Sequence, residues 1–583
     1  MGQTTSTESD GEVKYTNGKL SRAELDHLFV REATRLFKPI ELMSLRSNLG
    51  LQELQGSKLV TRSQLVNVLK LVQTPATDDF LDCLHFIAKF PNYRDSSDLT
   101  VAGLIKALTI LDSDKFVDLF GNNRRYFLMQ IYLALSFGAQ LDEPSEKSEK
   151  SQPVEDPIDV VYSNDKLQWI LIPQVQSFDG LGVSKYQLSA PKFLRFIAFL
   201  LFVSPVSLSL NPTLPLSEQF ESDDQNWYKY EQRAMNLLRS FDLDLSKSNY
   251  HTRKIPFNAF ERIIGTSLAN GSMPHLLDPL HHILDSLLYT TPVALRRLDF
   301  SESRILTHSM LAELATILPP DLVYQRLRKL FVGAESGFSM RSMESKVFKW
   351  NAPTILLVSG KTIQIQPSSE PAPQNKKYTA FMSEYPRFHA SHADSPKLPA
   401  PDSDQCVFMV YMERPWRISN GECFGDEHCF IAQLSPRQIL FPSSNNAQNF
   451  AYFNTLGGGL GFGSKPPLVK NNVRIYRPGE VSLTIEAGME IASFRHLAIP
   501  GTYRTGSVFS STVPEFEHSF EITNLEVWGC GSEKELAEQK KLWEWENREA
   551  EARKKLNSMN WEDGKALLEM AGMIDTKRSG GSV

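Results

Sequence analysis

PTILLVSGKTIQIQ, residues 353–366, decides the fold of this 583-residue chain. Two apolar runs flank Ser359-Gly360, and this pattern predicts two strands joined by a hairpin turn. Similar short runs follow as far as Gly529, and turn residues bound each of them. They are CVFMVYME (406–413), CFIAQLS (429–435), QILFPS (438–443), FAYFNT (450–455), SLTIE (482–486) and EITNLEVWG (521–529). Many short strands with few helices between them predict a two-layer antiparallel β-sandwich.

The chain before this region has helical patterns, so the expected class is α+β with several domains. Residues 21–140 are expected to form one helical domain, because Ser21 with Glu24 and Thr61 with Gln64 form capping boxes ahead of apolar stripes. Residues 141–164 are charged and predict a linker, and residues 165–300 predict a second helical section. Residues 367–404 contain seven prolines and predict a disordered insertion within the strand region.

Both helical sections look vaguely like EF-hand helix pairs, but their metal loops are degenerate. Asp112 and Asp114 begin one such pattern, and the glycine and glutamate that calcium loops need do not follow them. Asp242 and Asp244 begin another, in which Arg253 stands where the bidentate glutamate belongs. A cation at that position would repel calcium. We therefore expect scaffolds that bind no metal, and the sequence predicts no cofactor.

Composition excludes several classes of protein. The net charge of −6 and the pI near 6.1 argue against direct nucleic-acid binding. Five scattered cysteines favour a reducing compartment over a disulfide framework. The longest apolar run, residues 196–203, is too short to span a bilayer and predicts a buried helix. The N-terminus lacks the apolar core of a signal peptide, so the expected location is cytosolic.

The N-terminus matches the pattern for myristoylation. Gly2 follows the initiator methionine, Ser6 stands at the preferred hydroxyl position, and the polar tail of residues 1–20 is expected to be disordered. A single myristoyl chain binds membranes only marginally. Because the tail is acidic and has no nearby cysteine, we expect a membrane protein partner to supply the second attachment.

The last section, residues 532–583, changes character. Ser532 with Glu535 forms a capping box, and Glu–Arg and Glu–Lys pairs at i,i+4 spacing predict a charged helix. The helix carries Trp543, Trp545 and Trp561. It either packs back on its own domain or docks on a partner, where tryptophan is enriched.

Three groups of residues invite a chemical role. The glycine cluster comprises Gly457, Gly458, Gly459, Gly461 and Gly463, and it matches no phosphate-binding motif. It predicts close backbone approach at a bend in a sheet. Cys423 and Cys429 show no zinc spacing but leave open a reactive thiol. Glu526, in an apolar strand, is either a structural buried acid or part of a partner-binding surface.

The order of ILTHSMLAELATILPPDL (305–322), FGDEHCF (424–430), TLGGGLGFGS (455–464) and FEITNLEVWGCG (520–531) resembles the TLDc domain, which would span residues 301–531. The whole architecture is similar to the fungal restriction of telomere capping family and to the animal lysosomal, myristoylated TLDc protein. The resemblance implies a protein without enzymatic activity that binds the vacuolar proton-pumping ATPase (V-ATPase) and modulates its assembly at the cytosolic face of the vacuole membrane. It implies an indirect link to telomere capping. A role in oxidative-stress resistance through a reactive thiol is the alternative.

Overall fold

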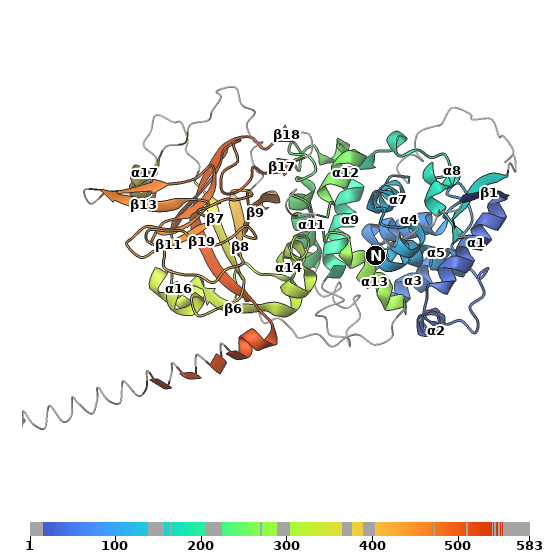
Figure 1. Ribbon diagram of the computed structural model, residues 1–583, viewed down its shortest axis with the longest axis horizontal. Coiled ribbons are helices and arrows are strands. Elements are labelled where there is room, and N and C mark those ends of the chain that lie inside the picture. The colour runs from blue at the N-terminus through green and yellow to red at the C-terminus, as the bar shows by residue number, and fades with distance from the viewer. Residues whose placement is uncertain are drawn as a thin grey trace, which may run out of the picture.

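The computed structural model describes residues 15–137, 157–163, 166–204, 224–266, 268, 271–288, 303–363, 376–386, 388, 403–470, 473–508, 511–538, 540, 541, 544, 545, 548, 549 and 551. Helices form one half of the elongated molecule, and a large antiparallel sheet forms the other half (Figure 1). The α+β class expected from the sequence is therefore confirmed. The described start of the C-terminal helix leaves the sheet half and points away from the body (Figure 1).

The first helices begin where the sequence places capping boxes. Ser21 caps the first helix and Thr61 caps the third, and in each case the side chain of Glu24 or Gln64 bonds back to the cap backbone. The helices of this section are α1 (Arg22–Arg35), α2 (Pro39–Asn48), α3 (Arg62–Val68), α4 (Pro75–Ala88), α5 (Val101–Leu111), α6 (Ser113–Phe120) and α7 (Arg124–Phe137).

Two segments that were expected to be a disordered tail and a linker instead contain strands. β1 (Tyr15–Leu20) lies within residues 1–20, and β2 (Ile158–Ser163) lies within residues 141–164. The two pair antiparallel, and β3 (Lys166–Leu167) adds a third strand. β1 reads YTNGKL and is mostly polar, so no apolar alternation identifies it as a strand. β2 reads IDVVYS and is only six residues long, with Val160 as its one fully buried residue.

The second helical section packs around α9 (Ala190–Val203), which contains the apolar run of residues 196–203 and is almost entirely buried. Strands β4 (Leu188–Ser189) and β5 (Lys254–Ile255) pair just before α9 and α12. The other elements of this section are η2 (Trp169–Leu171), α8 (Pro173–Gln176), η3 (Val183–Lys185), α11 (Asp224–Leu238), η5 (Tyr250–Thr252), α12 (Phe257–Ile263) and α13 (Asp278–Leu288). In the described part of the chain, no helix has the length and apolar character needed to cross a membrane. The EF-hand likeness of these helices stays a prediction.

Ten strands form the large sheet, in the order β10-β9-β8-β7-β19-β16-β15-β12-β11, with β6 also paired to β19. They are β6 (Leu327–Val332), β7 (Thr354–Thr362), β8 (Gln405–Met412), β9 (Phe430–Ser435), β10 (Ile439–Pro442), β11 (Ala451–Asn454), β12 (Gly459–Phe462), β15 (Val481–Ile485), β16 (Ile491–His496) and β19 (Phe516–Cys530). Two short hairpins stand apart, β13 (Lys465–Lys470) with β14 (Val473–Arg477) and β17 (Ser507–Val508) with β18 (Ser511–Thr512). Helical elements here are α14 (His308–Leu314), η7 (Leu322–Arg326), α15 (Gly333–Ser336), α16 (Met340–Val347) and α17 (Lys376–Glu384).

The large sheet folds over on itself into two layers. Four strands separate β10 from β16, so a flat sheet would hold them about 24 Å apart at the usual strand spacing. The ring centroids of Phe441 on β10 and Phe494 on β16 are nevertheless 5.0 Å apart. The two layers therefore enclose one apolar core, as expected for a sandwich.

The opening segment is one strand and not a hairpin. β7 runs straight through Ser359 and Gly360, so the predicted turn at this point is wrong. Gly360 faces Ile522 of β19, where the register shifts, and a Cβ at this glycine would lie 2.4 Å from the carbonyl oxygen of Glu521. The glycine serves a bulge and a close backbone approach, which give the same local signal as a turn.

The expected insertion at residues 367–404 contains a helix. α17 lies inside this stretch and packs its Phe381 against Tyr476 of β14, with ring centroids 5.2 Å apart. The prolines that predicted disorder lie mostly outside the described residues. This helix packs through an aromatic contact on a strand about a hundred residues away. No local sequence pattern reveals such a contact.

The helical half and the sheet half share one core. On β7, Ile355 and Leu357 belong to the cluster that extends through the helices, whereas Leu356 and Val358 face the interior of the sandwich. Both faces of the strand are thus buried, which explains its continuous apolar run. The loop between β9 and β10 also docks on α11, where Arg239 donates a 2.7 Å hydrogen bond to the carbonyl oxygen of Pro436.

Candidate interaction site

The C-terminal helix starts from a rigid base at the end of β19. Gly529 and Gly531 lie against the indole of Trp350, where an added Cβ would come within 2.5 and 2.6 Å of ring atoms. Trp350 is buried and donates a 3.0 Å hydrogen bond to the carbonyl oxygen of Pro353. This contact fixes the direction in which the chain leaves the sheet. Trp350 was not among the residues predicted from the sequence, although the Gly-Cys-Gly spacing signals a backbone lying on a large side chain.

Capping and one ion pair then define the first turn of the helix. The backbone N–H and the hydroxyl of Ser532 both donate to the carboxylate of Glu535, and these bonds lower the pKa of Glu535. Arg328 of β6 pairs with Glu533 at 3.0 Å. Residues 533–538 are helical and mostly exposed. The predicted capping box is therefore present, and beyond this first turn the described part of the helix points away from the body (Figure 1).

The structure describes one of the three tryptophans of this helix. Trp545 is 52% exposed, and its surroundings along the described part of the helix are charged. Trp543 and Trp561 lie outside the described residues. An indole exposed on a helix that points away from the body is suited to a contact with another protein.

Glu526 lies in the interior and ties the two ends of the strand region together. It is fully buried, and its carboxylate accepts hydrogen bonds from the Ser303 hydroxyl (2.6 Å) and the Arg304 backbone N–H (2.7 Å). The backbone N–H of Ile305 and the indole N–H of Trp528 also donate to it, each at 3.1 Å. With four donors the carboxylate is fully satisfied. Of the two roles left open, this geometry favours the structural one and leaves no surface for a partner.

The glycine cluster forms the turn between β11 and β12 and the strand after it. Its members are Gly457, Gly458, Gly459, Gly461 and Gly463. At Gly459, where φ is +67°, a Cβ would lie 2.2 Å from the carbonyl oxygen of Ile485. At Gly461 it would lie 2.1 Å from the ring of Tyr452. These residues bring neighbouring strands and an aromatic ring into close contact, and they leave no open cradle for a phosphate.

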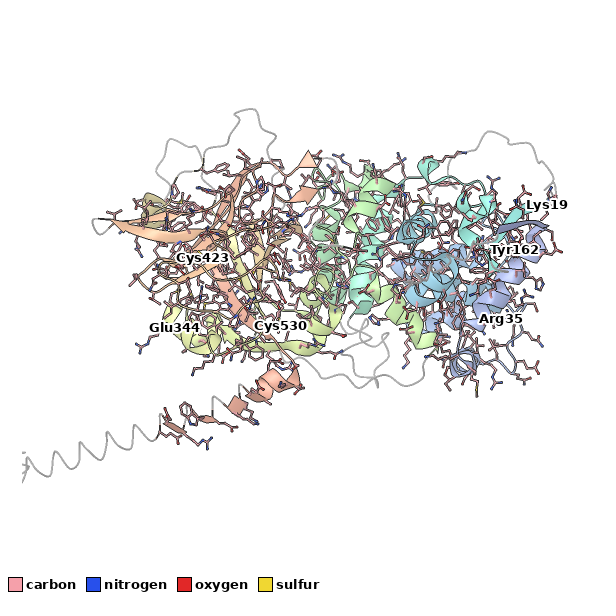
Figure 2. The ribbon with its side chains drawn as sticks, in the orientation of Figure 1. Lys19, Arg35, Tyr162, Glu344, Cys423 and Cys530 are labelled. Atoms are coloured by element: carbon pink, nitrogen blue, oxygen red, sulfur yellow. The ribbon has the colours of Figure 1, made fainter. Side chains whose placement is uncertain are left out.

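The two cysteines considered as reactive thiols do not have the surroundings of one. Burial raises the pKa of Cys423 to about 11 and that of Cys429 also to about 11. A reactive cysteine needs the opposite shift. Figure 2 shows Cys423 within the sheet half, well separated from Cys530 near the base of the C-terminal helix. The free thiols are Cys83, Cys406, Cys423, Cys429 and Cys530.

At the two degenerate metal loops predicted from the sequence, the side chains are not arranged as calcium ligands. Asp112 is the N-cap of α6 and pairs with Lys115 at 2.7 Å, so the residues after it form a helix and not a loop. Arg253 lies 3.4 Å from Asp242 and 4.0 Å from Asp244, where its guanidinium partly neutralises both carboxylates. Within the described ranges, no group of three or more His, Cys, Asp and Glu side chains could hold a metal ion.

Comparison with known proteins agrees with this picture. Residues 300–531 match the TLDc domain family. Over its full length the chain is 35% identical to restriction of telomere capping protein 5 of Komagataella phaffii, and each protein covers the whole of the other. The chain belongs to this family. Proteins of the same name from Kluyveromyces lactis and from Saccharomyces cerevisiae strain RM11-1a are each 32% identical, again over the full length of both chains. The resemblance drawn from the sequence is thus confirmed, and the large folded sheet is a TLDc domain.

Proposed function

We propose that this protein is a non-enzymatic adaptor that binds the V-ATPase at the cytosolic face of the vacuole membrane and modulates the assembly of that pump. One observation carries the proposal: a helix with an exposed tryptophan leaves the TLDc domain and points away from the body (Figure 1). Membership in the TLDc family, whose members are associated with this pump, supplies the partner.

The alternative function, resistance to oxidants through a thiol of this chain, has less support. Burial raises the pKa of both candidate cysteines, which keeps them as thiols at neutral pH. The relatives are named for the restriction of telomere capping. For this chain we propose an indirect link, because a net charge of −6 does not suit direct contact with DNA.

Capture of the pump from vacuolar membranes tests the proposal. The tagged full-length chain is expected to recover V-ATPase subunits from detergent-solubilised vacuoles. Trp545→Ala is expected to weaken the recovery by about tenfold or more, as for an interface hot spot. Lys541→Ala changes another exposed residue of the same helix and serves as the matched control. Recovery of no V-ATPase subunit, from membranes that retain the protein, would remove this function.

We further propose that acylated Gly2 and the protein partner together hold the chain at the membrane. The Gly2→Ala variant cannot be acylated and is expected to move from the membrane to the soluble fraction, because a myristoyl chain contributes about 0.8 kcal/mol per buried CH₂. Cell fractionation measures the shift. Unchanged partition of this variant would show that the acyl chain is not needed.

A further inference from the structure

The β13–β14 hairpin projects from the TLDc domain, and the proposed function assigns it no role. Its two strands pair only with each other, outside the large sheet. It extends from the sheet half at the end of the molecule opposite β1 (Figure 1). This hairpin was not predicted from the sequence, although Asn471-Asn472 between two short apolar runs is a turn signal.

One face of the hairpin is covered by α17. Tyr476 is buried there among the rings of Phe381 and Tyr385, with centroids 5.2 and 6.1 Å away. Arg474 pairs with Glu384 of the same helix at 3.1 Å. This face is therefore complete without any further partner.

The opposite face carries three aliphatic side chains in solvent. Leu468 and Ile475 stand directly opposite each other across the two strands and are 51% and 45% exposed. Val473, two residues before Ile475, is 52% exposed. Cross-strand aliphatic neighbours with this much exposed surface form an apolar patch at the end of the molecule.

The same hairpin is basic in an acidic protein. Residues 465–477 read KPPLVKNNVRIYR, with Lys465, Lys470, Arg474 and Arg477 and no carboxylate, whereas the whole chain carries a net charge of −6. Lys465 is exposed at the base of the hairpin, and in the strand register Lys470 is opposite Val473. The hairpin thus carries an exposed lysine at its base and a second lysine opposite one residue of the apolar patch.

We propose that this hairpin is a lipid-contact element that places Leu468, Val473 and Ile475 at the surface of an anionic membrane, with its lysines against the headgroup phosphates. Apolar side chains bordered by basic ones are the combination that binds membrane interfaces. Three side chains are far fewer than the roughly 20–30 residues a side of a stable protein–protein interface. A lipid surface, in contrast, needs only a few inserted side chains together with complementary charge.

The inference rests on the membrane location in the proposed function and deepens it. A single acyl chain needs a second attachment for stable binding. The hairpin and β1, which follows the predicted acylation site in the chain, lie at opposite ends of the long axis (Figure 1). Attachment at both ends would lay the molecule along the membrane and limit its orientation toward a partner.

Vesicle co-sedimentation of the unacylated full-length chain tests the hairpin without the acyl group or the pump. The wild-type chain is expected to sediment with vesicles that contain phosphatidylserine and far less with phosphatidylcholine alone. The Leu468→Ser/Ile475→Ser double variant is expected to bind about tenfold more weakly, because it loses two inserted aliphatic side chains. Lys465→Gln/Lys470→Gln is expected to weaken binding by at least about tenfold, at about fivefold for each charge.

Matched double variants elsewhere on the surface are the controls. Leu59→Ser/Leu171→Ser removes two exposed leucines, and Lys58→Gln/Lys254→Gln removes two exposed lysines. Thermal melting checks that every variant is folded. The proposal is overturned if wild-type protein ignores both vesicle types, or if the control variants lose as much binding as the hairpin variants.

Pump capture in detergent separates this inference from the proposed function. The hairpin variants are expected to recover V-ATPase subunits as well as wild type does, because no lipid surface is involved. Loss of pump capture together with unchanged vesicle binding would show that the hairpin contacts protein and would overturn the proposal. If wild type recovers no pump but binds vesicles through the hairpin, the proposed function fails and this inference stands.

Discussion

The Glu526 carboxylate is the residue that joins the beginning of the TLDc domain to its last strand. It receives hydrogen bonds from three successive residues, 303–305, which lie more than two hundred positions earlier in the chain. Buried carboxylates are tolerated only when donors replace the lost water. The sequence showed a carboxylate in an apolar strand but not its donors, so it left the role of this residue open.

Removal of this carboxylate is expected to be strongly destabilising. Glu526→Ala leaves two backbone N–H groups and an indole N–H without an acceptor and should lower the free energy of unfolding by about 3–5 kcal/mol. Urea unfolding measures the change. Glu521→Ala removes an exposed carboxylate from the same strand and should cost less than about 1 kcal/mol. Equal effects of the two substitutions would contradict the role assigned to Glu526.

His496 is a buried imidazole that the fold holds neutral. One ring nitrogen, Nε2, accepts from the backbone N–H of Gly506 at 3.2 Å, so Nδ1 must carry the proton that it shares with the carbonyl oxygen of Pro514 at 3.1 Å. Burial lowers the pKa of His496 to about 4. A second proton would face the Gly506 N–H and break this arrangement.

The lowered pKa of His496 predicts a loss of stability in acid. The unfolded chain takes up a proton near pH 6.5 and the folded chain only near pH 4, so the contribution is complete above pH 6.5 and is lost as the pH falls toward 4. The loss should be about 1.4 kcal/mol per pH unit. Glu313 acts in the opposite direction, because burial raises its pKa to about 7.

A comparison of variants separates the contribution of His496 to the pH dependence of stability from that of Glu313. The fall in the free energy of unfolding from pH 7 to pH 5.5 should be about 1.4 kcal/mol smaller in His496→Gln than in wild type. His428 is exposed, and His428→Gln serves as the matched control. An unchanged pH dependence in His496→Gln would show that this imidazole is not the group responsible.

The helices and strands were predictable where a signal was local. Capping boxes at Ser21, Thr61 and Ser532 located helix starts, and continuous apolar runs located buried strands and α9. The segments that failed depend on distant partners. β1 needs β2, α17 needs Tyr476, and Gly360 gave a turn signal that in fact serves a bulge against β19. For the interaction site, the sequence indicated the charged helix, but it could not show which indoles are exposed.

Strand β12 is expected to tolerate no side chain at Gly461. The Gly461→Ala methyl group would come 2.1 Å from the Tyr452 ring and should lower the free energy of unfolding by about 1–3 kcal/mol through overpacking. Gly421→Ala is the control, since nothing lies within 4 Å of its added Cβ. Urea unfolding distinguishes the two, and a neutral effect at Gly461 would mean that the tyrosine moves aside freely.

The C-terminal helix is expected to contribute little to the stability of the body. Among the described residues, truncation after Gly531 removes a helix cap and the Arg328–Glu533 ion pair, whose glutamate is exposed, so the melting temperature should fall by no more than about 4 °C. Trp350→Ala, which empties the buried base of the helix, should cost about 3–5 kcal/mol. A large drop on truncation would instead mean that the helix packs on its own domain.

Because the helical half and the TLDc domain share a continuous core, we expect them to unfold cooperatively. Buried side chains of β7 belong to the same apolar cluster as α9 and α14, and the β9–β10 loop is bonded to Arg239. Independent domains would instead meet through a small polar interface.

Calorimetry is expected to show a single cooperative transition for the full chain. Arg239→Ala removes a buried hydrogen bond between the halves and should lower the free energy of unfolding by about 2–3 kcal/mol. The transition should remain single. Arg62→Ala, at an exposed ion pair, should have an effect below about 1 kcal/mol. Two separated transitions in wild-type protein would rule out the shared unit.

The position of β19 has a consequence for how the protein is made. This strand is the last of its domain to leave the ribosome, yet it pairs with β6, β7 and β16 in the middle of the sheet. At about 5–20 residues per second, roughly 10–40 s separate the synthesis of β6 from that of β19. During that interval the early strands expose unpaired edges and apolar faces, so the nascent chain should depend on chaperones until its final strand arrives.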